Sequence, residues 1–326
     1  MNGPVSRRRV LSGLTALPAL LLAGCGEEAP IGSNPPARLF IATGNTTGVY
    51  YQLGGGFADI ITRQLPGYEA TAEPTGASID NIYRVARADA DIGFTLADAA
   101  ADAVAGTGQF DRNPQPIQAL ARIYSNYMHL IVRADLEVEE LTDLEDLRVS
   151  TGGPASGTEM IALRLLTAAG LDPDRDIERV PLSLPATVDA MRRRSLDAMF
   201  FSGGLPTGGI SDLLASMAGR LSFLPLNEFV APLREQYGEV YSDAVIPART
   251  YGLTADVPTI SVSNLLVVRR TMHADLAYDL TRLLFTHTDD LAVVHPEGRN
   301  ILVENGPITG PVPLHPGASR FFDEQQ

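Results

Sequence analysis

Residues 38–51 read RLFIATGNTTGVYY, and this stretch decides the fold class. Residues 38–42 are almost wholly apolar, which is typical of a strand buried in a sheet. A glycine-rich turn follows them. Residues 49–65 then show the apolar spacing of a helix, at Leu53, Phe57, Ile60 and Ile61. The stretch therefore predicts a strand, a tight turn and a helix in direct succession.

The same order continues along the chain. Residues 69–74 and 91–96 are two further strand candidates. Between them, Ser78 is placed to cap a helix that carries Ile79, Ile82 and Val85 on one face. Strand–helix–strand–helix–strand order is typical of a parallel sheet with helices on both faces.

A second cycle of this kind follows the first. It contains predicted strands at 118–124, 128–132, 148–151, 178–181 and 197–201 and predicted helices at 158–169 and 186–194. Residues 259–268 alternate polar and apolar side chains before becoming wholly apolar, as a strand passing between two environments would. Residues 274–286 are helical.

Two α/β modules flanked by long strands predict an α/β protein of two lobes with a ligand cleft between them. We expect residues 37–126 and 264–326 to form lobe one and residues 127–263 to form lobe two. About 290 residues are enough for two cores of this size. Ligands in such folds lie at the carboxyl ends of the strands.

The N-terminus reads MNGPVSRRRVLSGLTALPALLLAGC, and it predicts export. Arg7–Arg9 form a positive segment, and residues 11–22 are apolar but too short for a stable membrane anchor. Small residues before Cys25 match the site at which a lipoprotein is cut and lipidated. Residues 1–24 are therefore a predicted lipoprotein signal peptide, and residues 25–36 are the lipidated cysteine and its tether.

The predicted location is the periplasm or the outer face of the cytoplasmic membrane, with a lipid anchor. The three arginines also approximate a twin-arginine signal, so export by that route or by the general secretory route stays open. The residues do not decide which membrane leaflet holds the anchor.

Composition excludes several kinds of chemistry. Cys25 is the only cysteine, and lipidation would consume it, which leaves no disulfide and no thiolate site. All 25 basic residues are arginine, so a P-loop lysine and a Schiff-base lysine are excluded. Removing the signal peptide takes away three arginines and no acids, which changes the formal net charge from −14 to −17. A chain this acidic is a poor candidate for binding nucleic acid.

Two polar, glycine-rich turns stand between a strand and a helix, at residues 43–51 and 152–159. Glycine lets a backbone approach a ligand closely, and the first N–H groups of a helix have no partner within it. Such a turn offers donors and a partial positive charge to a carboxylate or phosphate. Ordinary turns with Ser or Thr caps are the alternative, but one turn in each half of the chain favours a binding site.

The search for catalytic and metal-binding patterns is negative. The five histidines form no HExxH motif and no pair four residues apart, so we expect no metal site. The glycine turns match neither GxGxxG nor a P-loop, and no GxSxG motif is present. Asp98 follows the third strand and is the best carboxylate candidate for the cleft, with a helix N-cap as the alternative. We expect no cofactor and no enzymatic activity.

Three other features have a preferred interpretation. Adjacent helical residues point about 100° apart, so at most one of Tyr50 and Tyr51 should face the cleft. The glycines at residues 54–56 suggest close packing of the helix on its sheet. Arg84 and Arg122 are candidate charge partners for an anion, although a surface position is the better interpretation of each.

These residues together resemble the TAXI family of TRAP transporter solute receptors. The similarity is carried by five blocks in the family's order, within residues 41–55, 75–94, 149–159, 197–206 and 313–318. The resemblance implies a two-lobed, type II-like periplasmic-binding-protein fold that closes on a small organic anion and delivers it to a membrane permease. The better-understood members bind an acidic amino acid or a related carboxylate.

The resemblance also implies ligand-binding residues. By position they are Thr43, Gly44, Thr46, Thr47, Gly48, Tyr50, Ser78, Asn81, Ser156, Gly157, Thr158, Ser202 and Gly203, to which the cleft candidate Asp98 is added. Residues 96–98 read Leu-Ala-Asp where the family often has Gln-Ser-Asp, and residues 124–127 also differ from the family. The loss of two polar side chains favours a ligand with an apolar or shorter tail.

The expected partners are a small organic anion, permease subunits and, through the lipid, a membrane. We expect a monomer. The alternative function is a sensor lipoprotein that presents its closed form to a membrane kinase. Both functions would use the same cleft, so the residues do not separate them.

Overall fold

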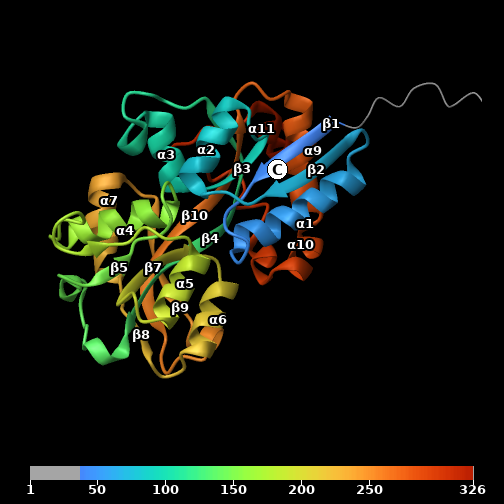
Figure 1. Cartoon of the computed structure of the whole chain (residues 1–326). Coiled ribbons are helices and arrows are strands. Elements are labelled where there is room, and N and C mark those ends of the chain that lie inside the picture. The colour runs from blue at the N-terminus through green and yellow to red at the C-terminus, as the bar shows by residue number, and fades with distance from the viewer. Residues whose placement is uncertain (1–36, 326) are drawn as a thin grey trace, which may run out of the picture. The chain divides into compact units, whose positions relative to one another are not determined.

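A computed structural model describes residues 37–325 of the chain (Figure 1). The predicted signal peptide, Cys25 and the tether to residue 36 lie outside these residues. Within the described part, ten strands form a sheet in the order β2-β1-β3-β10-β4-β7-β5-β6, with β8 paired to β4 and β9 to β10. Helices cover both faces of the sheet, so the predicted α/β class is confirmed.

Most of the predicted helices and strands are present, close to their predicted positions. The strands are β1 (Ala37–Ala42), β2 (Tyr68–Glu73), β3 (Ile92–Leu96), β4 (Ile117–Arg133), β5 (Arg148–Ser150), β6 (Glu178–Arg179), β7 (Ala198–Gly203), β8 (Leu221–Phe223), β9 (Tyr241–Ile246) and β10 (Val257–Arg269). The helices are α1 (Val49–Gln64), α2 (Ser78–Arg87), α3 (Ala97–Ala105), α4 (Gly157–Ala168), α5 (Leu184–Arg192), α6 (Gly208–Ser216), α7 (Val230–Tyr237), α8 (Ala248–Tyr251), α9 (Ala274–Thr286), α10 (Thr288–Val294) and α11 (Pro316–Asp323).

The first α/β module comprises residues 37–105. Its strand β1 lies between β2 and β3 and runs parallel to both. The apolar face of α1, formed by Leu53, Phe57, Ile60 and Ile61, is almost completely buried. Burial of each such side chain contributes about 1.5–3 kcal/mol, which is why the helical spacing was a reliable guide to this part of the fold.

Gly54 explains the glycine run in α1. A Cβ at this position would lie only 2.4 Å from Cγ2 of Thr43, at the end of β1. The helix therefore approaches the sheet more closely than any larger residue allows, as the sequence predicts. A Cβ at Gly55 would have no atom within 4 Å, so Gly55 plays no part in this contact.

The second α/β module comprises residues 148–216. Strand β5 is parallel to both β6 and β7, and β7 is antiparallel to β4. Helices α5 and α6 pack against β7 through Val188, Met191, Ile210 and Leu213. Strand β8 pairs with β4, and strand β9 pairs with β10. These two strands and the helices α6, α7 and α8 were not predicted from the sequence.

The predicted break between two strands at residues 125–127 is wrong. Residues 118–124 and 128–132 were expected to be two strands, but they belong to the single strand β4. The polar residues between them look like a turn in the sequence. In the structure they stay in the ladder, because Ser125, Asn126 and Tyr127 all pair with β10.

Strand β10 changes its neighbour halfway along. Residues 257–262 pair with β9, whereas residues 264–268 pair with β3. The predicted change of environment within this strand is therefore a change of partner, located at Ser263. Strand β4 begins to pair with β7 at Tyr127, close to the same level.

The buried core is continuous across the two modules. One cluster of apolar side chains includes Ile82 of α2, Ala99 of α3 and Leu165 of α4. A second cluster, which includes Phe57 and Phe321, lies beneath α1, α9 and α11. Among residues 37–325, no helix has the length and apolar character needed to cross a membrane.

Candidate functional site

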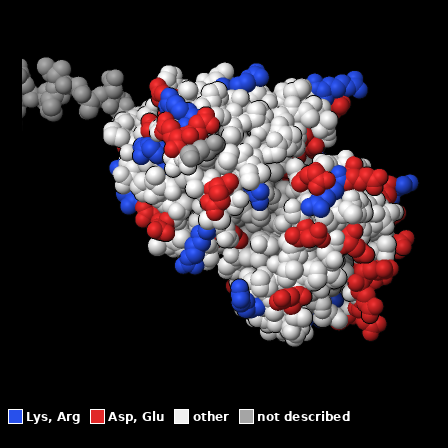
Figure 2. All heavy atoms as spheres, turned by 180° about the vertical axis from the view of Figure 1, so that it is seen from behind, with Lys and Arg blue, Asp and Glu red and all other residues white. Residues whose placement is uncertain are grey.

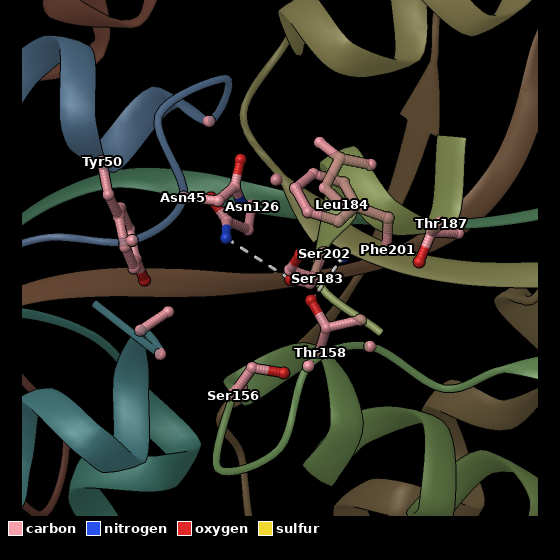
Figure 3. Close-up of a pocket in the computed structure, with 18 of the residues that line it drawn as sticks. Asn45, Tyr50, Asn126, Ser156, Thr158, Ser183, Leu184, Thr187, Phe201 and Ser202 are labelled. Atoms are coloured by element: carbon pink, nitrogen blue, oxygen red, sulfur yellow. Dashed lines mark hydrogen bonds between the residues drawn. The ribbon is translucent and has the colours of Figure 1, made fainter. Parts of the chain in front are cut away.

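A cavity of about 170 Å³ lies between the two modules. Its walls come from the turns after β1, β2, β5 and β7, from the segment that leads into α5 and from the middle of β4. In both modules these turns follow the carboxyl ends of parallel strands, where α/β folds bind ligands. Figure 3 shows side chains from these elements converging on one space.

The turn after β1 holds the N-terminus of α1 at the cavity. The Asn45 side-chain oxygen accepts hydrogen bonds from the Thr47 backbone N–H at 3.2 Å and from its hydroxyl at 2.9 Å. Gly48 is the N-cap and donates its own N–H to the Asn45 carbonyl. No side chain caps α1, so its first N–H groups, beginning at Val49, have no partner within the helix.

The turn after β5 holds the N-terminus of α4 on the other side of the cavity. Ser156 is the N-cap, and its hydroxyl oxygen accepts from the Glu159 N–H. A Cβ at Gly157 would lie 2.4 Å from Cδ1 of Leu96 and 2.7 Å from Oγ of Ser78. Glycine is therefore required where α4 begins, because this end of the second module lies directly against the first.

Helix α2 differs from α1 and α4, because its N-terminus is already occupied. The Ala155 carbonyl accepts from the N–H groups of Ile79 at 3.2 Å and Asp80 at 3.3 Å. This contact joins the second module to the first. Of these three helices, α1 and α4 therefore keep backbone donors for a ligand, whereas α2 does not.

Three hydroxyl groups at the cavity keep a free proton. Oγ of Ser156 accepts from Glu159, Oγ1 of Thr158 accepts from the Ser202 N–H at 3.1 Å, and Oγ of Ser202 accepts from Asn126 at 3.4 Å. None of the three donates to an acceptor within residues 37–325, and each is at most 8% exposed. Each of these hydroxyl groups can therefore donate to an acceptor in the cavity that it lines.

A buried chain of hydrogen bonds runs beneath the cavity from one module to the other. The Tyr50 hydroxyl donates to Oδ1 of Asn264 at 2.5 Å, and Nδ2 of Asn264 donates to Oδ1 of Asn126 at 2.9 Å. Asn126 continues the chain to Ser202 (Figure 3). Asn264 and Asn126 stand on β10 and β4, at the level where both strands change partners. Burial raises the pKa of the Tyr50 hydroxyl far above its usual value, so Tyr50 is a neutral donor.

The remaining lining is uncharged, and one side of it is mainly apolar. Leu184 and Phe201 lie together on one side of the cavity, away from Ser156 and Thr158 (Figure 3). Among the described residues, those that line the cavity include no arginine, aspartate, glutamate or histidine. The site therefore presents a polar, donor-rich side and an apolar side.

The structure brings together eight of the residues predicted from the sequence. The residues that line the cavity are Gly44, Gly48, Tyr50, Ser156, Gly157, Thr158, Ser202 and Gly203. Tyr51 is outside the lining, as the helical spacing predicts for the neighbour of Tyr50. Their contact with a ligand remains a prediction.

The other predicted residues lie outside the lining and have structural partners. Thr43 donates to the Glu73 carbonyl, and Asn81 donates to the carbonyls of Thr43 and Phe94. The Ser78 hydroxyl accepts from the Leu96 N–H. Thr46 is exposed, and Thr47 is held by Asn45.

Asp98 belongs to a buried ionic cluster and not to the cavity lining. Its Oδ2 accepts from the Tyr241 hydroxyl at 2.8 Å and lies 3.8 Å from Nη1 of Arg164. Arg164 also pairs with Asp102 and stacks on the ring of Tyr237, with 3.9 Å from guanidinium to ring centre. Burial raises the pKa of Asp98, and Arg164 opposes that rise. The cluster joins α3 to α4, α7 and β9.

Neither suggested arginine lies at the cavity. Arg84 pairs with Asp80 at 2.9 Å, and Arg122 is half-buried and donates its backbone N–H to the Gly306 carbonyl. Figure 2 shows the charged side chains scattered over the outer face of the molecule. Among the described residues, no charged residue is part of the lining of the candidate site.

No cluster of acidic, histidine or cysteine side chains within residues 37–325 has the composition of a metal site. His129 is fully buried, and its ring nitrogens contact the carbonyls of Tyr127 and Phe201 and the hydroxyl of Tyr251. Burial lowers the pKa of His129 to about 4, so the ring is neutral near pH 7.

Five further lining residues lie in the two turns that the sequence predicts to bind the ligand: Asn45, Val49, Gly152, Gly153 and Pro154. The rest of the lining was not predicted from the sequence and comprises Thr75, Gly76, Ala77, Tyr124, Asn126, Leu182, Ser183, Leu184, Thr187, Met199, Phe200, Phe201 and Gly204. A signal was present for some of them, because Thr75–Ala77 and Leu182–Leu184 each follow a predicted strand and precede a helix. Tyr124 and Asn126 had no such signal, because they lie within a strand.

Solved structures of low sequence identity share the fold. A binding-protein component of an ABC phosphonate transporter from Pseudomonas aeruginosa is 14% identical, with a TM-score of 0.54 over 82% of this chain and 80% of that one. PhnD1 from Prochlorococcus marinus, in complex with methylphosphonate, is 12% identical, with a TM-score of 0.55 over 82% and 92%. A Xanthomonas citri protein bound to ATP is 13% identical, with a TM-score of 0.51 over 88% and 95%. The architecture is thus the two-lobed fold of periplasmic binding proteins.

The sequence profile of one family covers most of the chain. It matches residues 41–325, from β1 to the residues that follow α11, and so includes both modules and every turn of the cavity. A match of this extent shows family membership. The protein belongs to the NMT1-like family.

Proposed function

We propose that this protein is an extracytoplasmic solute receptor that binds a small carboxylate and delivers it to a TRAP-type membrane permease. The observation that carries the proposal is the pair of helix N-termini, one from each module, at a single cavity. Each helix end supplies unpaired N–H groups and about half a positive charge. A carboxylate between them would be held by both modules at once.

The hydroxyl donors support the same ligand chemistry. Ser156, Thr158 and Ser202 all belong to the second module, and none of them donates its hydroxyl proton within the described residues. Hydrogen bonds to an ionised group are shorter and stronger than those between neutral groups. Directional donors are needed here, because the formal net charge of −17 expected for the mature chain repels an anion at long range.

The composition of the cavity favours a receptor over an enzyme. The lining offers serine and threonine hydroxyls but no histidine, carboxylate or lysine that could act as a general base. A hydroxyl nucleophile without a base is weak at neutral pH. Turnover of a bound carboxylate at enzyme-like rates would contradict this proposal.

The lobe boundaries remain part of the proposal. Lobe one would combine residues 37–126 with 264–326, and lobe two would comprise residues 127–263. The change of partner in β10 at Ser263 and the start of the β4–β7 pairing at Tyr127 support these limits. In a binding protein these strands would bend as the lobes close on the ligand.

The permease assignment rests on the resemblance of the sequence blocks to the TAXI receptors. The location would be the periplasm or the outer face of the cytoplasmic membrane, with a lipid on Cys25. Presentation of the closed form to a sensor kinase is the alternative. Uptake of a labelled ligand into cells that lack either the receptor or the permease separates the two, since a pure sensor leaves uptake unchanged.

A binding experiment tests the receptor itself. Equilibrium dialysis against carboxylates, sugars and metal cations should give saturable binding of a carboxylate only. Replacing Ser156 and Thr158 together by alanine should weaken that binding by about 1–3 kcal/mol, the value of hydrogen bonds to a charged group. Thr286→Ala removes an exposed hydroxyl far from the cavity and is the matched control.

Two outcomes would contradict the proposal. If a sugar or a cation binds and no carboxylate does, the site does not bind anions. If the double alanine variant keeps its affinity, the two hydroxyl groups do not contact the ligand and only cap a helix and support a strand. Thermal unfolding without ligand is needed as well, because the loss of the Ser156 cap alone costs about 1 kcal/mol of stability.

A further inference from the structure

We infer that the ligand is a short monocarboxylate of about six to eight non-hydrogen atoms that has no amino group and no second acid group. This inference rests on the proposed carboxylate-binding function and narrows its ligand class. It differs from the acidic amino acid that the family resemblance implies. Size, charge and the position of the apolar wall each support it.

The size of the cavity limits the ligand. A cavity of about 150 Å³ in another protein admits benzene, which has six carbon atoms. The cavity here, at about 170 Å³, is only slightly larger. Butanoate and pentanoate, with six and seven non-hydrogen atoms, are of this size. Glutamate has ten and exceeds it.

The charge of the lining argues against an amino group. An ammonium group out of water needs a carboxylate or several carbonyl partners. No aspartate or glutamate of the described chain lines the cavity, and the nearest buried carboxylates are already used. Glu159 pairs with Arg179, and Glu297 accepts from the Leu205 N–H and from Asn300. The positive ends of α1 and α4 would also repel an ammonium group.

The apolar wall argues against a second acid group. The carboxylate head lies, in the proposed arrangement, between the N-termini of α1 and α4. The tail then faces Leu184, Met199 and Phe201, whose side chains offer no donor. A second carboxylate there would have no charged partner, because no arginine lines the cavity. The hydroxyl of Thr187, which lines the same side, already pairs with Ser150 and the Leu182 carbonyl, and Ser183 is exposed. A hydrocarbon tail replaces water on this wall at no such cost.

The residues that form the apolar side of the cavity are not the ones expected from the sequence. Leu96 and Ala97, which replace polar residues of the resembling family, are outside the lining. Leu96 instead packs against the start of α4 at Gly157. The wall belongs to the second module, at the start of α5 and in β7.

A chain-length series tests the inference on the full chain. Isothermal titration calorimetry would use acetate, propanoate, butanoate, pentanoate, hexanoate and octanoate. Affinity should rise about fourfold with each added methylene that enters the apolar part, and it should fall once the cavity is full. We expect the maximum at butanoate or pentanoate.

Two pairs of probes of matched size test the charge argument. 4-Aminobutanoate has the size of pentanoate but carries an ammonium group, and succinate has the size of hexanoate but carries a second carboxylate. 4-Aminobutanoate should bind at least a hundredfold more weakly than pentanoate, and succinate at least a hundredfold more weakly than hexanoate. Methylphosphonate and ethanesulfonate complete the panel as anions of a different geometry.

The outcomes separate this inference from the proposed function. Tighter binding of succinate, glutamate or 4-aminobutanoate than of pentanoate overturns the inference but leaves a carboxylate receptor. Binding of methylphosphonate or ethanesulfonate with every carboxylate inert overturns both. No maximum along the length series, with affinity still rising at octanoate, overturns the size argument.

A variant tests where the tail lies. Leu184→Ala enlarges the apolar side, so the preferred chain length should increase by one or two carbons and butanoate should bind about tenfold more weakly. Leu302→Ala is the control, because Leu302 is 40% exposed and outside the lining. An unchanged length preference in the folded Leu184 variant would place the tail elsewhere and overturn the assignment.

Discussion

Replacing Arg164 by methionine should destabilise the protein by about 3–5 kcal/mol, the usual cost of removing one partner from a buried ion pair. The arginine side chain is only 9% exposed, and it faces Asp98 and Asp102, which are 0% and 15% exposed. Without it, two carboxylates lie in a buried region with no cation. Methionine keeps most of the apolar length of the side chain, so the loss is mainly electrostatic.

The assay is urea unfolding at pH 7, with thermal unfolding as a second measure. A loss of 3–5 kcal/mol corresponds to a fall in melting temperature on the order of 10 °C for a chain of this size. The difference in unfolding free energy between the intact protein and the variant should become smaller as the pH falls toward 5. Burial already raises the pKa of Asp98 in the intact protein, and loss of the opposing Arg164 raises it further. In the variant, Asp98 therefore takes up its proton more readily in the folded than in the unfolded state.

A second substitution tests the cause. Asp98→Asn in the Arg164→Met background removes one uncompensated charge and keeps an acceptor for Tyr241, so the double variant should be more stable than the sum of the single effects predicts. A cost below 1 kcal/mol for Arg164→Met, or strictly additive effects, would refute the view that this cluster holds α3 against α4.

The other predictions concern separate parts of the chain. Burial lowers the pKa of His129 from 6.5 to about 4. Because the unfolded chain protonates first, the contribution of His129 to stability should be constant above pH 7 and fall by on the order of 3 kcal/mol as the pH drops from 6.5 to 4. In urea titrations a His129→Gln variant should lose this part of the pH dependence and keep the part that comes from His295 and His315, whose pKa values burial also lowers. Gly54→Ala should cost about 1–3 kcal/mol by overpacking against Thr43, whereas Gly55→Ala should be neutral or stabilising, as measured by thermal unfolding. Cys25→Ser should move the mature protein from the membrane to the soluble fraction without changing its ligand affinity, and retention in the membrane fraction would contradict the lipidation site.

Local patterns predicted most of the fold. The helical spacing in α1 and the apolar run of β1 needed no information from the rest of the chain, and the structure confirms both. The polar run within β4 was misread, because a turn and a strand that supplies polar groups to a buried site look alike in sequence. The side chain of Asn126 accepts a hydrogen bond from Asn264, which is far away in sequence. This bond lets a polar residue occupy a buried position within the strand.

The candidate site was predictable only where all the residues that indicate binding occur within one turn. The turns before α1 and α4 contain glycine, hydroxyl groups and a helix start, and both line the cavity. Asp98 looked equally suitable, but its partners Arg164 and Tyr241 lie far away in sequence. The apolar wall at Leu184 and Phe201 was missed for the same reason, since an apolar residue near a strand end is usually part of the core.

The continuous core has a consequence for how this protein loses its structure. The cluster that contains Ile82 and Leu165 belongs to both modules, so neither module retains its full buried surface when the other unfolds. Two lobes with separate cores would melt as two events. Here calorimetry should record a single cooperative transition, and a destabilising change in either module should lower the melting temperature of the whole.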